Sequence, residues 1–215
     1  MLPGNLDPTK CKMSKIIFLN GCGSSGKTSI SRSIQYLSEE LWLTFGVDTF
    51  IGMTPFPSEG PKETGYFRFI PGKNTRGPTM HVESGPNGKQ LFGIMPTFAE
   101  MLANKGNNLI IDEVLFDDSS LNAYTKSLSN HTVYYIGIFC ELDIMQEREI
   151  LRRDRCIGLS NDQIDRVHQG ARSLYDFKVD TSNKSPFEAA HQILGFIKNN
   201  PAPQRFQELI SISKP

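Results

Sequence analysis

The chain has 215 residues, and its 23 basic residues balance 23 acidic ones, so the composition predicts no broad basic surface for nucleic acid or for a membrane. This length predicts one domain with a sizeable core. No apolar run reaches the about 18 residues of a membrane-spanning helix, and residues 1–12 are too polar for a signal peptide. The four cysteines lack CxxC spacing, which favours reduced thiols and a cytoplasmic location.

A β-branched, apolar run at residues 15–20 leads directly into a Gly-rich stretch, and an amphipathic helical pattern covers residues 29–41. The Gly-rich stretch matches the phosphate-binding pattern GxxxxGK[ST] at every fixed position, in the strand, loop and helix context that the pattern requires. We therefore predict that it binds a nucleotide. The predicted binding residues are Gly21, Cys22, Gly23, Ser24, Ser25, Gly26, Lys27 and Thr28.

The residue types of this loop explain the predicted chemistry. Glycine accepts the tight turns that bring backbone N–H groups to phosphate oxygens, and the following helix start adds partial positive charge. Lys27 is expected to reach the β- and γ-phosphates. The hydroxyl of Thr28 is expected to bind Mg²⁺.

The apolar run at residues 41–50 predicts a second buried strand with Asp48 at its C-terminal edge. Ligands of open parallel sheets bind at that edge, so Asp48 would face the same crevice as the phosphate loop. An equally favoured interpretation is that Asp48 caps a short helix starting at Thr49.

Residues 56–89 change in character, because Gly, Pro and Asn surround two short β-prone segments. These segments predict a hairpin that turns near residues 72–74 or 75–77. We interpret the region as an insertion on the substrate side of the sheet, where it forms a lid or a substrate wall.

Residues 90–105 resume a helical pattern whose apolar side, Phe92, Met95, Phe98, Met101 and Leu102, is expected to face the core. Residues 108–113 then form an apolar strand ending in two acids, a pattern that suits a carboxylate holding Mg²⁺ or its water. Strand alternation favours Asp112 over its neighbour for this role. The alternative is a strand-end acid in solvent.

The next segments predict a short helix at residues 119–129, a strongly β-prone strand at 132–140 and a helix at 144–153. That helix ends in Arg152, Arg153, Asp154 and Arg155, which form either a solvated charge run or a lid, here assigned to residues 152–162, that closes over phosphates. A helix at 162–169 and a strand at 173–181 follow. Ser185 caps a last helix that ends near Lys198.

Alternating strands and helices predict an α/β fold of three layers, the P-loop NTPase fold, with a five-stranded parallel sheet flanked by helices and a hairpin-like insertion. We assign residues 1–13 to a flexible extension, 14–199 to a kinase domain and 200–215 to a tail that packs back or binds a partner. The guanine-specificity pattern NKxD is absent, which favours a compact kinase over a regulatory GTPase.

Several of these segments together resemble the chloramphenicol phosphotransferase family, over about residues 15 to 198. The block FGVD at residues 45–48, standing after the phosphate loop, is much more specific than the loop alone. The other similar segments are residues 17–28, 110–114, 137–140, 148–149, 152–155 with Gly158, 167–168 and 179–181.

The resemblance implies that ATP phosphorylates a hydroxyl of a small molecule, in the archetype the primary hydroxyl of chloramphenicol, and hence antibiotic resistance. Asp48 would accept the hydroxyl proton, while Lys27, Arg152 and Arg155 would neutralise phosphate charge. Thr28 would bind Mg²⁺, supported by Asp112. The alternatives are a kinase of another metabolite, nucleoside or protein hydroxyl, and a nucleotide-binding regulatory module without transfer activity. The acceptor's identity and the oligomeric state stay open.

Overall fold

The computed structural model describes residues 13–55, 65–152 and 156–212. Four predicted features therefore lie outside the described residues: most of the N-terminal extension, residues 56–64 of the insertion, the lid residues Arg153 and Arg155, and the last three residues of the tail. Within the described ranges, no helix combines the length and the apolar character that crossing a membrane requires.

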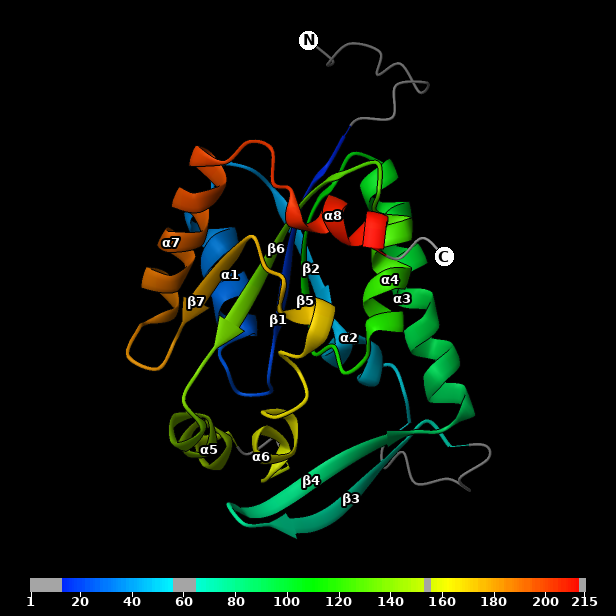
Figure 1. Cartoon of the computed structure of the whole chain (residues 1–215), viewed down its shortest axis with the longest axis vertical. Coiled ribbons are helices and arrows are strands. Elements are labelled where there is room, and N and C mark those ends of the chain that lie inside the picture. Colours follow the sequence, from blue (N-terminus) through cyan, green and yellow to red (C-terminus); the bar gives the residue numbers. More distant parts are fainter. Residues whose placement is uncertain (1–12, 56–64, 153–155, 213–215) are drawn as a thin grey trace.

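Five parallel strands form the central sheet, in the order β2-β5-β1-β6-β7, and β1 lies in the middle. This arrangement, with helices on both faces, confirms the predicted three-layer α/β fold of a P-loop protein (Figure 1). The strands are β1 (Lys15–Gly21), β2 (Trp42–Gly46), β5 (Asn108–Glu113), β6 (Thr132–Phe139) and β7 (Phe177–Asp180).

Alternating residues of β1 divide the apolar core into two layers. Ile17 and Leu19 face α1 (Lys27–Leu37) and α7 (Pro186–Asn199), whereas Ile16 and Phe18 face α3 (Pro86–Asn104), α4 (Asp118–Ser127) and α8 (Arg205–Ile212). Successive strand residues point to opposite faces, so a strand buried on both faces is apolar throughout. The two helical layers lie on either side of the sheet in Figure 1.

The C-terminal segment packs back onto the domain. Phe206 and Leu209 of α8 are almost fully buried in the layer that contains Phe18.

The cap of α7 is as predicted: the hydroxyl of Ser185 accepts from the backbone N–H of Glu188, whose carboxylate accepts from the backbone N–H of Ser185. Helix α7 therefore begins where the sequence predicts.

The predicted hairpin is confirmed as β3 (Phe67–Asn74) paired antiparallel with β4 (Gly77–Ser84). Its turn lies at residues 74–77, the second of the two predicted positions, where Gly77 adopts a φ of +125°. The hairpin projects beyond the carboxyl end of the sheet and passes beside α6 (Leu159–Gln163) (Figure 1).

Three predicted boundaries are wrong. The second strand ends at Gly46, which pairs with Asp112 of β5, and the chain then turns at once into α2 (Val47–Ile51). The fifth strand begins at Phe177, since residues 170–173 form a 3₁₀ turn. The helix predicted at 90–105 begins earlier, at Pro86, and its Met101 is exposed rather than in the core.

The helix predicted at residues 162–169 is also wrong: α6 covers Leu159–Gln163, after α5 (Leu142–Leu151). The start of α6 is fixed from outside the local sequence. The carboxylate of Glu149 in α5, almost fully buried, accepts the backbone N–H groups of Gly158 and Ser160 at 2.9 and 2.6 Å. A distant carboxylate thus takes the place of a local capping residue.

Candidate active site

The phosphate loop joins the carboxyl end of β1 to the start of α1. Its backbone turns sharply, with left-handed conformations at Ser24 and Gly26, whose φ values are +61° and +94°. Gly21 lies so close to β6 that a Cβ would come within 2.5 Å of the backbone oxygen of Ile138. Such a turn directs successive N–H groups into one concave surface, which binds anions.

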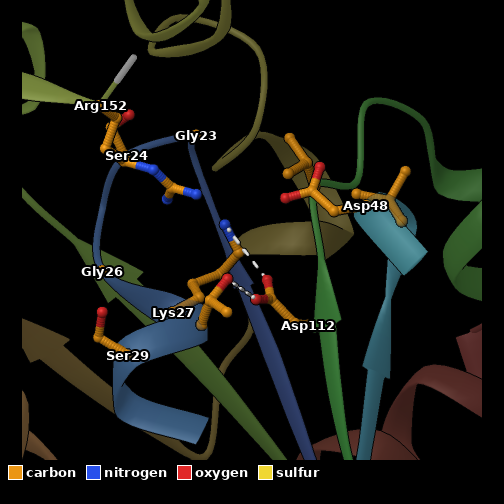
Figure 2. Close-up of a pocket in the computed structure, with 11 residues that line it drawn as sticks. Gly23, Ser24, Gly26, Lys27, Ser29, Asp48, Asp112 and Arg152 are labelled. Carbon is orange, nitrogen blue, oxygen red and sulfur yellow. Dashed lines mark hydrogen bonds and ion pairs between the residues drawn. The ribbon is translucent and has the colours of Figure 1, made fainter. Parts of the chain in front are cut away.

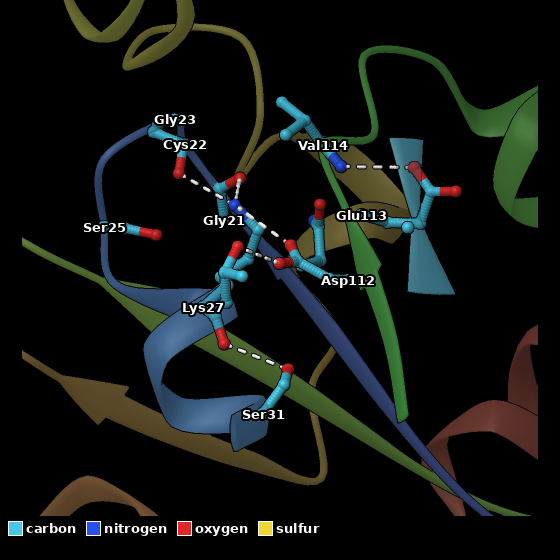
Figure 3. A network of polar contacts seen from close by, with 12 residues as sticks. Gly21, Cys22, Gly23, Ser25, Lys27, Ser31, Asp112, Glu113 and Val114 are labelled. Atoms are coloured by element: carbon cyan, nitrogen blue, oxygen red, sulfur yellow. Dashed lines mark hydrogen bonds and ion pairs between the residues drawn. The ribbon is translucent and has the colours of Figure 1, made fainter. Parts of the chain in front are cut away.

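Lys27 and Thr28 project from the first turn of α1 to meet Asp112 at the end of β5. The ammonium of Lys27 donates to the backbone oxygens of Gly21 and Cys22, at 3.0 and 2.9 Å, and lies 3.5 Å from a carboxylate oxygen of Asp112 (Figure 3). The Thr28 hydroxyl donates to the other carboxylate oxygen, at 2.7 Å. The predicted pairing of loop and strand-end acid is therefore present, and Asp112 rather than Glu113 makes it.

The polar groups of the loop fit a bound triphosphate. The hydroxyl oxygens of Ser24 and Ser25 are buried, and neither has a hydrogen-bond partner among the residues that the structure describes. Buried hydroxyls normally have partners, and phosphate oxygens would satisfy both. The loop is therefore suited to a ligand rich in acceptor oxygens.

The site also fits Mg²⁺, which prefers oxygen ligands and usually takes only one or two of them from the protein. Thr28 and Asp112 supply such oxygens next to the loop. Across the described ranges, no three His, Cys, Asp or Glu side chains gather in a metal-binding arrangement. A metal here would thus depend on phosphate oxygens for further ligands.

Asp48 lies in the first turn of α2, where Gly46 precedes the helix, so it is neither at the strand end nor the helix cap. Its carboxylate nevertheless points toward the phosphate loop (Figure 2). Arg152, at the end of α5, directs its guanidinium toward the same space from the opposite side (Figure 2). Gly23, Lys27, Thr28, Asp48, Asp112 and Arg152 line one small pocket there.

This pocket adjoins a cavity of about 1550 Å³ between the sheet edge, α3 and the hairpin. One wall carries Phe67, Phe69 and Val82 of the hairpin, and the others carry apolar side chains of α3 and of the segment after β5. Four cationic side chains, those of Arg32, Arg68, Lys89 and Arg152, line it as well. The cavity can therefore enclose an organic molecule with an apolar or aromatic body beside the phosphate loop.

Glu113, next to Asp112, faces the cavity from a buried position. Its carboxylate accepts the hydroxyl of Tyr124 at 2.6 Å and the backbone N–H of Val114 at 3.2 Å. Burial raises the pKa of this carboxyl from 4.5 to about 7, and the charge of Asp112 adds to the effect.

We expect Glu113→Gln to alter how stability depends on pH. The unfolded carboxyl ionises near pH 4.5 and the folded one near 7, so between these values the folded state holds the extra proton. The free energy of unfolding of the wild type therefore falls as the pH rises through this window, at up to about 1.4 kcal/mol per pH unit. Glu113→Gln removes this fall, and urea unfolding at several pH values measures it.

The matched control is Glu39→Gln, which alters an exposed carboxyl on the surface. That variant should follow the wild-type pH profile. Parallel profiles for the wild type and Glu113→Gln between pH 5 and 7 would contradict an elevated pKa for Glu113.

The sequence interpretation missed several contacts of the loop. The backbone N–H of Gly23 donates to the side-chain oxygen Oε1 of Gln163 in α6, at 2.5 Å. On the other side of the loop, Thr181 after β7 donates through its hydroxyl to the backbone oxygen of Ser25, and Arg148 donates to the backbone oxygen of Thr181. Only the family resemblance pointed to Arg148 and Thr181, and no local sequence pattern pointed to Gln163.

Comparison with known proteins gives a consistent result. A family model described as "Chloramphenicol phosphotransferase-like protein" matches residues 14–198. Two strains of Mycobacterium tuberculosis have a relative named "Putative O-phosphotransferase", 26% identical over 207 residues, which cover 91% of this chain and 87% of the relative.

Several similar solved structures are kinases. The APS kinase of Mycobacterium tuberculosis, solved with AMPPNP and APS, has a TM-score of 0.58 at 11% identity, covering 87% of this chain and 99% of that one. Shikimate kinase from Acinetobacter baumannii, solved with shikimate, has a TM-score of 0.53 at 14% identity, covering 87% and 94%. At these identities the likeness shows a common fold.

Proposed function

The chain belongs to the chloramphenicol phosphotransferase-like family, and we propose that it transfers the γ-phosphoryl group of ATP to a hydroxyl of a small, chloramphenicol-like molecule. That it is a phosphotransferase of the kinase type follows from the family and the fold. What we propose is the identity of the nucleotide and of the acceptor. We further propose that the enzyme acts in the cytoplasm, which supplies ATP and keeps thiols reduced, and that residues 14–199 form the catalytic domain.

One observation carries the proposal: Lys27 of the phosphate loop faces Asp48 across a pocket that Thr28 also lines. The loop would hold the nucleotide, and the cavity beside Asp48 would hold the acceptor. The phosphoryl group to be transferred would then lie between them. A binding module that transfers nothing has no need of a carboxylate at this position.

In the proposed reaction, the acceptor oxygen forms a bond to the γ-phosphorus while the bond from that phosphorus to the β–γ bridging oxygen breaks. Asp48 takes the hydroxyl proton, and ADP leaves. Phosphoryl transfer has a loose transition state, so positioning and charge stabilisation supply most of the rate. Asp48 would therefore act largely by orienting the hydroxyl toward the phosphorus.

Charge on the phosphate oxygens would be balanced from several sides. Lys27 lies within the loop, and Arg152 directs its guanidinium at the same pocket; Arg155 is proposed to share this role. Arginine keeps its charge and matches phosphate oxygens in a bidentate manner. Mg²⁺, when bound by Thr28 with support from Asp112, would add positive charge on the β- and γ-phosphates.

The cavity favours two acceptor classes. Its phenylalanine side chains suit an aromatic compound such as chloramphenicol, whose phosphorylation would give antibiotic resistance. Arg68 and Lys89, in the same lining, favour a second class of hydroxylated metabolites that carry an anionic group. A bound compound of either class would have its hydroxyl beside Asp48.

The test is a transfer assay with ATP, Mg²⁺ and chloramphenicol, followed by mass spectrometry. We expect one phosphate to be added to chloramphenicol and none to the derivative whose primary hydroxyl is acetylated. A panel of anionic hydroxylated compounds tests the second class in the same assay. If chloramphenicol gains no phosphate while a member of the panel does, the second acceptor class replaces the first.

A further inference from the structure

Gln163 is placed to contact the phosphates of a bound nucleotide. It is the last residue of α6, its side chain is 7% exposed, and its Oε1 lies 2.5 Å from the backbone nitrogen of Gly23. The fit is close, since a Cβ on Gly23 would approach Oε1 to 3.1 Å. The side chain thus rests directly against the loop.

The orientation of the amide follows from this contact. A backbone N–H only donates, so the atom that faces Gly23 must be the oxygen. The two N–H donors on Nε2 then remain, and Nε2 has no hydrogen-bond partner among the residues that the structure describes. Gln163 lines the large cavity together with Gly23, Asp48 and Arg152. The two N–H donors on Nε2 are therefore available to a ligand bound between the phosphate loop and the proposed acceptor.

The hairpin holds α6 in position. The side chain of Asn161 donates to the backbone oxygen of Pro78 at 2.8 Å and exchanges hydrogen bonds with the side chain of Asn74. The backbone N–H of Met80 donates to the backbone oxygen of Gly158 at 3.0 Å. Gly158 packs so tightly that a Cβ would lie 2.8 Å from the oxygen of Pro78.

The other side of α6 is fixed by Glu149, which accepts the backbone N–H groups of Gly158 and Ser160. The helix that carries Gln163 is thus attached both to α5 and to the substrate-side hairpin. A donor held in this way needs little reordering to meet a ligand, so its hydrogen bond keeps most of its strength.

We propose that the Nε2 amide of Gln163 donates a hydrogen bond to the γ-phosphoryl group of the nucleotide. The inference rests on the proposed function, which places that group between Lys27 and Asp48. Lys27 reaches the β- and γ-phosphates, and the terminal group is the one that enters the cavity lined by Gln163. The enzyme would thereby distinguish a nucleoside triphosphate from the diphosphate.

Calorimetric titration with AMPPNP and with ADP, both in Mg²⁺ buffer, tests this role. Gln163→Leu should weaken AMPPNP binding about tenfold or more, the effect of one hydrogen bond to a charged group, and change ADP binding less than about threefold. Gln163→Glu keeps the acceptor for Gly23, loses the donors and adds a negative charge that phosphates repel, so it should weaken AMPPNP binding more than ADP binding even if Gln163→Leu misfolds. The control, Gln169→Leu, alters an exposed glutamine shortly after α6 and should bind both nucleotides normally.

Equal losses for AMPPNP and ADP would overturn the inference, because Gln163 would then only shape the loop. AMPPNP binding by Gln163→Glu at the wild-type level would overturn it too. In both cases the wild type still binds nucleotide and the proposed function stands. A wild-type protein that binds neither AMPPNP nor ADP would overturn both proposals.

Discussion

Replacement of Asp48 by asparagine is expected to lower kcat for the acceptor by roughly 10² or more, because an amide cannot take the hydroxyl proton and orients the hydroxyl differently. Asp48 lies in α2, across the pocket from the loop. The proposed nucleotide contacts come from the phosphate loop and from Lys27, which the substitution leaves in place. The dissociation constants of ADP and AMPPNP should therefore stay within a few-fold of the wild type.

Steady-state kinetics and calorimetry measure the two halves of this result. Asp143→Asn, which changes an exposed carboxylate in the first turn of α5, is the matched control and should keep wild-type turnover. Near-normal turnover in Asp48→Asn would contradict the assignment of Asp48 as the group that receives the proton.

Replacement of Lys27 by alanine is expected to reduce both nucleotide affinity and turnover, the latter by on the order of 10³. The buried ammonium already contacts the backbone oxygens of Gly21 and Cys22 and lies near Asp112. The phosphate oxygens of a bound nucleotide would replace these backbone oxygens as acceptors of the ammonium's hydrogen bonds. Without the ammonium, the phosphates would meet the Asp112 carboxylate with no positive charge between them.

Loss of folding has to be separated from loss of binding in this experiment. Lys27→Met keeps the aliphatic stem that packs under the loop and removes only the charge, so it should lose nucleotide binding with a smaller drop in melting temperature than Lys27→Ala. Unchanged AMPPNP binding in Lys27→Met would mean that the loop does not hold a nucleotide as proposed.

The phosphate loop was predictable because its function is encoded in eight consecutive residues. The glycines, Lys27 and Thr28 are adjacent in the sequence, and the flanking strand and helix show clear periodicity. Asp112 was predictable for a related reason: it ends an apolar strand, and parallel strands place their carboxyl ends at one edge. Both predictions depend on local patterns only.

The local structure around Asp48 was predicted only in part, because the end of β2 depends on pairing with a strand distant in sequence. Gly46 pairs with Asp112 of β5, so closely that a Cβ would lie 2.1 Å from its backbone oxygen, and β2 ends there, two residues before the predicted acid. The carboxylate still reaches the pocket, from a helix instead of a strand. The interpretation of Asp48 as a strand-end residue was thus wrong, whereas the alternative of a short helix at this place was right except that the helix begins at Val47 instead of Thr49.

Gln163 was beyond prediction for the same physical reason. The start of α6 is capped by the buried Glu149 of another helix, and the hairpin holds its side. The residues of α6 itself carry no capping signal of this kind, and Asp162 wrongly suggested a later helix start. A residue whose position depends on three separate elements leaves no pattern in a single sequence window.

Parallel reactions with ATP radiolabelled at the γ-phosphate and with ATP radiolabelled at the α-phosphate test the central claim most directly. Each reaction contains the wild-type enzyme, Mg²⁺ and chloramphenicol, with the anionic hydroxylated panel alongside. The account predicts a labelled organic product from γ-labelled ATP alone, with Asp48→Asn yielding it far more slowly. Label transferred from the α-phosphate, or no labelled product from any hydroxyl compound, would contradict it.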